Sequence, residues 1–530
     1  MILIPLAIIL SAAVIYATIR GIHLLWFHPL AKYPGPRIAA ISNLWYIYAW
    51  YAFLHDLMWH KNTADQEGSA RLSGRYPWII EQQFHIYGDV VRIAPNDLVF
   101  RTPQAYKDIY GSTIRRREIF VKTDMQDLSE FTGFPDLGVA AERNPETHAQ
   151  VARALQPSFS SRVLQGCHGV IHQVVDEFVT QLERRGEVNL TEWVDYFAHD
   201  ISGELVYNRE AKIMKSGDPT PDIIASRKMS YLGAVIVALK RFPLLKFPLF
   251  VCLIPWALAS GISTFGKTVQ GYARARIAKG GKVRHLDLLE PIIPPEGSIV
   301  SQESKKRSDD WIVAQANSLM AGALGPVTNA IISSILLLCD WPETMKRLQE
   351  EVRATFESYD DITVEACQSA CPYLNAVIEE DLRLVTPAPF GLPRYSPGAD
   401  VDGHFVPPGI TVQTCNFAAA RNPDYYFLPR EFHPERFLQE THQWYDRRFS
   451  NDTKHAVMPF SIGPRRCTGA TIAYTELRLI LAKLAWALDV ELPASGKKVS
   501  WEEDVKVYAT YRFPNVWIKC EKAKLVSLIA

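Results

Sequence analysis

The sequence predicts a mainly helical protein with small β-sheets, preceded by an N-terminal transmembrane helix. Long stretches place apolar residues at helical spacing, strand patterns are short, and an uncharged apolar run opens the chain. The long helical patterns cover residues 170–185, 311–339, 342–359, 373–384 and 468–488. Strand patterns are confined to short segments such as residues 90–93, 98–100 and 411–413. Helices therefore dominate the expected fold.

The apolar run at the N-terminus is expected to anchor the protein in a membrane. Ile2 to Ile19 carries no charge and is just long enough, as a helix, to cross a bilayer core. A cleaved signal peptide fits less well, because no basic segment precedes the run and no convincing small-residue cleavage site ends it. The nearest cations, Arg20 and Lys32, follow the run, so the positive-inside rule leaves the rest of the chain cytosolic.

Domain boundaries follow from the segment after the anchor. Residues 1–27 form the expected anchor, and residues 28–36 contain three prolines, which make a stiff hinge. No low-complexity linker follows, so residues 37–530 are expected to form one catalytic domain. A second apolar stretch, Tyr231 to Ile262, is interrupted by charges and prolines. It fits either a segment that dips into the membrane surface or an ordinary buried helix.

Composition excludes several classes of protein. The chain is 48% hydrophobic and 22% charged, which is typical of a globular protein. Lys+Arg and Asp+Glu are equal at 57 each, which argues against general binding of nucleic acid, because that depends on neutralising phosphates. The eight cysteines are spread too thinly for a disulfide framework. Cys367 and Cys371 have no second Cys or His pair nearby, so a zinc site is not expected.

One cysteine stands in surroundings that suit a thiolate. The segment from Phe460 to Gly469 reads F-x-x-G-x-R-x-C-x-G and includes Gly463, Arg465 and Cys467. A lone cysteine is more often a small buried hydrophobe. Here, however, the glycine permits a tight turn, and the helix that follows would place its N-terminus and free N–H groups beside the sulfur. We therefore expect the pKa of this thiol to be lowered.

This ten-residue pattern resembles the haem-binding loop of the cytochrome P-450 superfamily, and its five fixed positions match without a gap. The resemblance implies the cytochrome P-450 fold and haem b, with Cys467 as the axial ligand of the iron and with Phe460, Arg465 and Gly469 as further haem contacts. It extends over nearly the whole chain. Residues 27–36 look most like those of membrane-bound fungal members of secondary metabolism.

A charge network is expected behind the thiolate loop. Glu380 and Arg383 are three residues apart, so they share one face of a helix and can pair. By itself this spacing is common on solvated helices. In the family that the chain resembles, such a pair is buried and joins an arginine from a later loop, which Arg436 matches. The implied role of the three residues is to hold the thiolate loop.

Two further residues are implied to bind the haem propionates. Arg394 follows Gly391-Leu392-Pro393, which resembles the family segment whose arginine pairs with a propionate. The alternative for Arg394 is a surface strand residue. His148 stands where relatives often carry Trp or His, and Arg153, five residues later, can point elsewhere.

The central helix departs from the family pattern. Relatives usually read A-G-x-[D/E]-T-[T/S], and the acid and the alcohol help to relay protons. This chain has Leu324 and Gly325 at those two positions, and neither can donate a proton. Pro326 is expected to kink the helix. Thr328 either orients water or bonds its own backbone, and the second reading is favoured.

The resemblance implies a haem-thiolate monooxygenase that oxidises a lipophilic natural-product intermediate with O₂ and electrons from an NADPH-cytochrome reductase. The missing acid and alcohol keep open oxidative coupling, cyclisation or rearrangement without oxygen insertion, and a non-catalytic haem-binding protein is a third class. We expect a monomer, single-pass in the endoplasmic reticulum membrane. The substrate pocket is expected at Ala321, Leu324, Gly325 and Leu392, and along residues 120–141.

Overall fold

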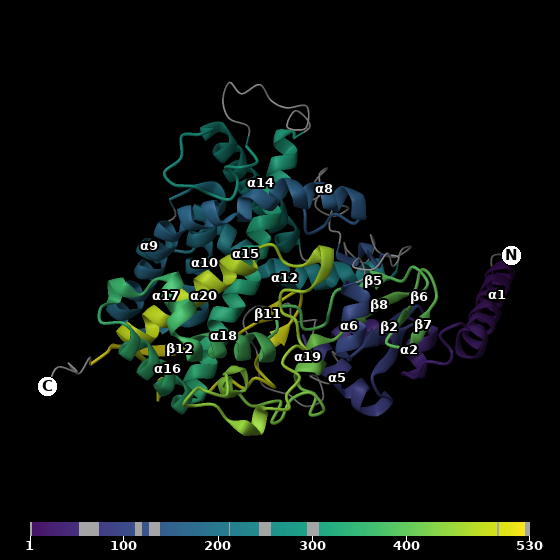
Figure 1. The fold of residues 1–530 in the computed structure, drawn as a ribbon. Helices are drawn as coiled ribbons and strands as arrows, with labels where there is room; N and C mark the ends of the chain where they lie inside the picture. The colour runs from purple at the N-terminus through teal and green to yellow at the C-terminus, as the bar shows by residue number, and fades with distance from the viewer. Residues whose placement is uncertain are drawn as a thin grey trace.

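The structure, a computed structural model, describes residues 3–51, 74–111, 119–126, 138–210, 212–242, 256–293, 307–494 and 498–524. Its described part is mainly helical with small β-sheets, as the sequence predicts (Figure 1). The longer helices are α1 (Leu3–Ile22), α5 (Tyr76–Tyr87), α8 (Pro145–Leu155), α9 (Ser161–Arg185), α10 (Leu190–Tyr207), α12 (Pro221–Lys240), α14 (Trp256–Lys279), α15 (Asp309–Asp340), α16 (Pro342–Thr355), α18 (Pro372–Leu384) and α20 (Ala470–Ala487). The shorter helices are α2 (Arg37–Ile41), α3 (Leu44–Tyr51), α6 (Pro103–Tyr110), α11 (Ile213–Ser216), α17 (Val364–Ala370) and α19 (Asn416–Ala420).

The five long helical patterns of the sequence correspond to α9, α15, α16, α18 and α20. The helix α16 ends at Thr355, earlier than predicted, and Tyr359 lies in a separate 3₁₀ turn. The helix α20 begins at Ala470 rather than at residue 468, because Gly469 is its N-cap. These differences are of the size expected at helix ends, where the sequence pattern is weakest.

The largest sheet has five strands in the order β1 (Val90–Ala94), β2 (Asp97–Phe100), β8 (Thr411–Thr414), β5 (Arg394–Tyr395) and β3 (Val121–Lys122). The three predicted strand segments are confirmed as β1, β2 and β8. A second sheet joins β4 (Glu187–Asn189), β12 (Trp517–Lys522) and β9 (Leu488–Glu491). Two hairpins are formed by β6 (Ala399–Val401) with β7 (His404–Val406), and by β10 (Lys506–Val507) with β11 (Tyr511–Arg512).

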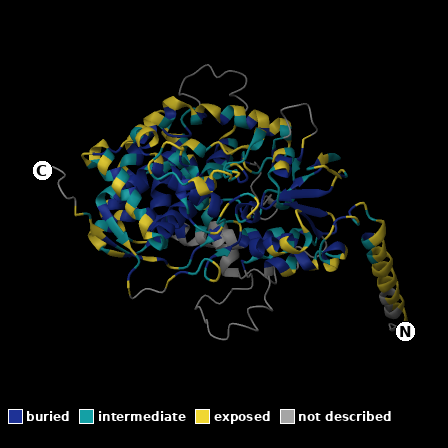
Figure 2. Ribbon diagram, turned by 60° about the horizontal axis from the view of Figure 1, so that its bottom comes forward, coloured by how far each residue is buried: buried dark blue, intermediate teal, exposed yellow. Residues whose placement is uncertain are grey.

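The core is built around α15, which runs through the middle of the body with α10, α14, α18 and α20 packed against it (Figures 1 and 2). Among the described helices, α15 alone is long and apolar enough to cross a membrane, but 67% of its most apolar window is buried inside the protein. It is therefore a core helix. Its burial explains why its sequence is apolar on nearly all sides.

The N-terminal helix α1 projects from the body, and its apolar side chains are exposed (Figure 2). Ile4 is 70% exposed and Ile19 is 62% exposed. By the same criterion of length and composition, residues 11–27 qualify only as a shorter apolar helix, so the predicted transmembrane span remains a proposal. Exposed apolar rows of this kind mark a surface that contacts a membrane or another protein.

The predicted hinge lies against the five-stranded sheet. Leu30 and Tyr33 are buried in a hydrophobic cluster with residues of β1, β2 and α6. The Arg92 N–H donates to the carbonyl of Pro34 at 2.8 Å, and the Arg92 side chain donates to the carbonyl of Leu24 at 2.9 Å. These contacts attach the end of the N-terminal segment to the body.

The second apolar stretch is divided between two helices. Its first part lies in α12, where Leu232, Val235 and Leu239 are buried in the main core. Arg241 follows and forms a buried ion pair with Asp97 of β2 at 2.5 Å. The first part is therefore ordinary buried helix, while residues 243–255 lie outside the described residues.

Candidate haem-thiolate site

The loop before α20 turns sharply and presents Cys467. Gly463 has φ +71°, and a Cβ at this position would lie 2.2 Å from the carbonyl oxygen of Tyr110. Only glycine fits both the backbone angle and the close contact. The Cys467 N–H donates to the carbonyl of Phe460 at 2.8 Å and closes the loop. The Phe460 ring is partly buried, with its centroid 5.0 Å from that of Tyr474.

Cys467 differs from the other described cysteines, since it is the one classed as exposed. The backbone N–H groups of Gly469 and Ala470, at the start of α20, face its sulfur as the sequence predicts. The prediction of a lowered pKa is nevertheless wrong for the protein by itself. Burial raises the pKa of the Cys467 thiol, and the two N–H groups offset only part of that rise. A cation bound at the sulfur would be needed to hold it as a thiolate.

The three residues of the predicted charge network meet in the core. Arg383 donates to both carboxylate oxygens of Glu380, at 2.6 and 2.8 Å, and Arg436 Nε donates to the same carboxylate at 3.0 Å. The backbone N–H of His433 adds a fourth hydrogen bond at 2.9 Å. Asp452 neutralises the second arginine, Arg436. The side chains of the three network residues are 0–2% exposed, so the charges are buried and mutually satisfied.

A cluster of four cationic or basic side chains includes one residue of the loop. It consists of Lys122 on β3, Arg394 on β5, His148 on α8 and Arg465 in the loop itself. Lys122 and Arg394 are direct cross-strand partners, so both side chains leave the same face of the sheet. In the described structure Lys122, Arg394 and Arg465 donate to backbone carbonyls, and none of the four side chains forms a salt bridge. Arg394 donates to Pro393 at 3.0 Å, and Arg465 donates to Arg143 at 3.0 Å.

The pKa values of the cluster show its mutual repulsion. Burial, with Arg394 and Arg465, lowers the pKa of Lys122 to about 7. Burial, with Arg465, Lys122 and Arg394, lowers the pKa of His148 to about 4. Burial and Arg394 also lower the pKa of Arg465 to about 10. Like charges directly opposite each other destabilise a strand pair, so this arrangement requires an anion.

The donor set fits the haem that the resemblance implies. Haem offers an iron that binds a thiolate and two propionates that bind cations. The protein offers the sulfur of Cys467 and a cationic cluster that includes Arg465 of the same loop. Arg394, Arg465, His148 and Lys122 would hold the propionates. Lys122 was not predicted from the sequence to take part in this site. Arg153 is exposed and donates to the carbonyl of Ala149 in its own helix.

The predicted pocket residues separate into three places. Ala321 is exposed although it lies in the middle of α15, so the helix borders accessible space there. Leu324 and Gly325 line a different cavity, between α15, α10 and the β10–β11 hairpin. Leu392 packs on the hydrophobic cluster of the five-stranded sheet. Residues 127–137 of the predicted pocket lie outside the described residues.

The helix α15 continues through Pro326. The hydroxyl of Thr328 donates to the carbonyl of Leu324, which is the favoured reading from the sequence. A larger cavity of about 570 Å³ is lined by residues such as Trp341, Arg421 and Trp501. It includes none of the site residues named above, so it is separate from the thiolate site.

Comparisons with known proteins agree with this geometry. The sequence model of the family described as cytochrome P-450 matches residues 76–510. The chain is 34% identical to the cytochrome P-450 monooxygenase poxC of Penicillium oxalicum, over 94% of this chain and 91% of that protein. It is 34% identical to the monooxygenase TwmD of Talaromyces wortmannii, over 97% and 95% of the two chains. It is 31% identical to the monooxygenase btcC of Colletotrichum orbiculare, over 92% and 88%.

Proposed function

Because the chain belongs to the cytochrome P-450 family, we propose that its haem b is bound through the thiolate of Cys467 and that it oxidises a lipophilic natural-product intermediate. Family membership makes the protein a haem-dependent oxidoreductase of the monooxygenase type. When bound, the haem supplies O₂ activation, which a cysteine ligand favours by donating electron density. The relatives named above are fungal monooxygenases, which supports a role in secondary metabolism.

One observation carries the assignment of the ligand. Cys467 is the exposed cysteine among those described. It faces the N–H groups at the start of α20 and lies two residues after Arg465, which belongs to the cationic cluster. A sulfur for the iron and cations for the propionates are thus available on one loop and its neighbours. The proposed role of Glu380, Arg383 and Arg436, which are joined by buried hydrogen bonds, is to support this loop from the core.

Spectroscopy of the reduced carbon monoxide complex tests the ligand. We expect the wild-type protein to show the red-shifted thiolate band and Cys467→Ala to lose it. Cys339→Ala is the matched control, because it removes a partly buried sulfur from the C-terminal end of α15. Retention of the thiolate band by Cys467→Ala would show that another residue binds the iron.

Electron supply and location complete the proposal. Family members generally receive electrons from a reductase and use O₂ with a lipophilic substrate. We propose an NADPH-cytochrome reductase as the partner, docked on the side of the cysteine. Residues 1–27 act as a single-pass anchor in the endoplasmic reticulum membrane, residues 28–36 connect it to the body, and residues 37–530 form the cytosolic catalytic domain. The exposed apolar side chains of α1 support the anchor.

A second function is favoured by a specific observation, namely Leu324 and Gly325 at the positions of the family acid and alcohol. The enzyme would then perform oxidative coupling, cyclisation or rearrangement without inserting oxygen. Turnover of pathway intermediates under isotopically labelled O₂ separates the two functions. Labelled oxygen in the product supports hydroxylation, whereas unlabelled product formed with consumption of O₂ and NADPH supports coupling or desaturation.

A further inference from the structure

A monooxygenase must bring protons to a buried site. One atom of O₂ enters the substrate and the other leaves as water, so each turnover consumes two protons and two electrons. In this chain the central helix carries Leu324 and Gly325, which have no proton-transfer group, at the positions of the family acid and alcohol. The protons must therefore reach the site through other residues.

A cavity of about 90 Å³ lies beside these two residues, between α15, α10 and the β10–β11 hairpin. A water molecule needs roughly 10–15 Å³ of such space, so the cavity has room for several. Asn329 lines it and is 6% exposed, and its amide nitrogen has no hydrogen-bond partner among the described residues. A buried amide without a partner is costly, and water in the cavity would satisfy it.

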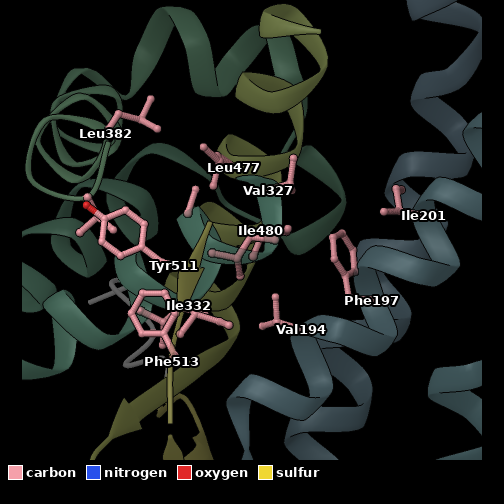
Figure 3. Packing of buried hydrophobic residues seen from close by; sticks show 14 of the residues in the cluster. Val194, Phe197, Ile201, Val327, Ile332, Leu382, Leu477, Ile480, Tyr511 and Phe513 are labelled. Carbon is pink, nitrogen blue, oxygen red and sulfur yellow. The ribbon is translucent and has the colours of Figure 1, made fainter. Parts of the chain in front are cut away.

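The helix α10 contributes a polar stripe to this cavity. Thr191, Asp195 and His199 recur at intervals of one helical turn, so they share one face, and all three line the cavity. The remainder of α10 is largely apolar and buried, as Val194 and Phe197 in Figure 3 illustrate. Asp195 is only partly buried, whereas His199 is 4% exposed. The stripe therefore leads from partial solvent contact into the core.

His199 is already engaged in a hydrogen-bonded pair. Its Nε2 lies 3.1 Å from the hydroxyl of Ser226 on α12, and that hydroxyl donates to the carbonyl of Ile223 at 2.8 Å. Because the serine proton is used in this way, Nε2 carries the hydrogen and the serine oxygen accepts it. The histidine is thereby held in one orientation at the cavity wall.

The hairpin supplies a hydroxyl at the place where α15 lacks one. A Cβ added to Gly325 would lie 3.1 Å from Cγ2 of Thr510 and 3.7 Å from its Oγ1. Glycine at position 325 thus lets the Thr510 side chain sit against the helix, within the space that a side chain at position 325 would occupy. Tyr511 and Phe513, which follow Thr510 in the chain, pack beside Ile332 of α15 and so hold this part of the chain against the helix (Figure 3).

Pro326 adds an acceptor close by. Proline has no N–H, so the carbonyl of Gly322 lacks the helical hydrogen bond that any other residue would provide. Gly322 is exposed on the accessible side of the helix. Its carbonyl can therefore accept a hydrogen bond from water on that side of the helix.

We propose that this cavity is the proton-supply route of the enzyme, with Asp195 as the entry carboxyl, His199 and cavity water as carriers, and Thr510 as the last hydroxyl. Asp195 takes a proton from solvent and passes one on, and each carrier gives one proton as it receives one. No carrier changes its oxidation state, and the two electrons come from the reductase. The proposal rests on the proposed monooxygenase function.

The test replaces one side chain of the proposed route at a time. Thr510→Val removes the proposed donor with little change in shape, Thr510→Ser restores it, and Asp195→Asn removes the entry acid. Thr328→Val is the matched control, because it makes the same change in the same cavity but removes a hydroxyl that is already bonded to the Leu324 carbonyl. The probe is the infrared C–O stretch of the reduced carbon monoxide complex in H₂O and D₂O, which needs no substrate.

We expect Thr510→Val to raise the C–O frequency and to abolish its shift in D₂O, with both restored in Thr510→Ser and neither changed in Thr328→Val. With reductase and NADPH, Asp195→Asn should slow oxygen reduction roughly tenfold. This is less than the 10²–10⁴-fold effect of a positioned proton donor, because water in the cavity can still deliver protons. Thr510→Val should release more hydrogen peroxide per NADPH.

An unchanged C–O frequency in Thr510→Val, or an equal change in Thr328→Val, would overturn the proposed route. An unchanged rate in Asp195→Asn would overturn the entry step. Failure of the proposed function is read separately, from the wild-type protein, as absence of the red-shifted thiolate band. A thiolate band with unaltered spectra in all the variants would leave the function standing and remove the route.

Discussion

Replacing Glu380 with glutamine should destabilise the protein far more than the same change at the next residue. Glu380 accepts four hydrogen bonds, three from Arg383 and Arg436 and one from the His433 N–H. Glutamine removes the charge and turns one acceptor oxygen into a donor that faces guanidinium N–H groups. Breaking a buried ion pair typically costs about 3–5 kcal/mol, because the remaining charge stays buried without its partner.

This loss of unfolding free energy should appear as a measurable shift in melting temperature. An unfolding entropy of about 2.1 cal/mol/K per residue gives roughly 1 °C per kcal/mol for a domain of this size, so the midpoint should fall by about 3–5 °C. Urea unfolding followed by far-ultraviolet circular dichroism measures the free energy directly. If the network supports the loop of Cys467 as proposed, the haem content of the purified protein should fall as well.

Glu379→Gln is the control for this experiment. Glu379 is adjacent and partly buried, and it accepts one hydrogen bond from the Tyr474 hydroxyl at 2.7 Å, which a glutamine oxygen can still accept. Its loss should be less than about 1 kcal/mol. Equal losses of unfolding free energy in the two variants would refute the argument that the buried charge pairing of Glu380, rather than its position on α18, stabilises the protein.

Two further predictions concern charge. Lys122→Met should weaken haem retention roughly 10- to 100-fold, which corresponds to the loss of about 1.5–3 kcal/mol for a charge-assisted hydrogen bond. Arg153→Met, at an exposed position, should leave haem retention unchanged. Transfer of haem to a scavenger protein measures retention in both variants. Wild-type retention should fall as pH rises through about 7, where free Lys122 loses its proton, and a flat profile would count against this cluster. Burial raises the pKa of Asp381 to about 8, with Ser333 and Ser334 offsetting part of the rise, so the folded state holds a proton that the unfolded state releases. The unfolding free energy should therefore fall as pH rises from about 4 to about 8, less steeply in Asp381→Asn, and equal slopes would exclude a buried neutral acid.

Sequence patterns were most informative where chemistry fixes residue type and spacing together. The contact of Glu380, Arg383 and Arg436 could be expected because a helix brings residues three apart onto one face, and a matching motif supplied the third member. The position of Gly463 followed in the same way from the tight turn that the loop needs. These features are local, or are tied to a motif that the family resemblance supplies.

Features that depend on register and depth could not be predicted. Lys122 joins the cationic cluster through the pairing of two strands of two residues each, and no pattern of that length is distinctive. The pKa of the Cys467 thiol was predicted with the wrong sign, because the N–H groups at the start of α20 are visible in the sequence whereas the burial that outweighs them is not. Asp195 and Thr510 belong to separate elements, so their place in the walls of one cavity depends on tertiary packing.

The pairing of Lys122 with Arg394 has a consequence for how the protein matures. The strand β3 is the outer edge of its sheet, is two residues long and places one cation opposite another. Such a strand gains little from its own hydrogen bonds and is repelled by its neighbour until two carboxylates arrive between them. Because β3 already pairs with β5, bound propionates would strengthen this attachment by separating the two cations. An enzyme without haem would hold this edge strand less firmly, and the edge would then be a preferred point of attack for quality-control proteases.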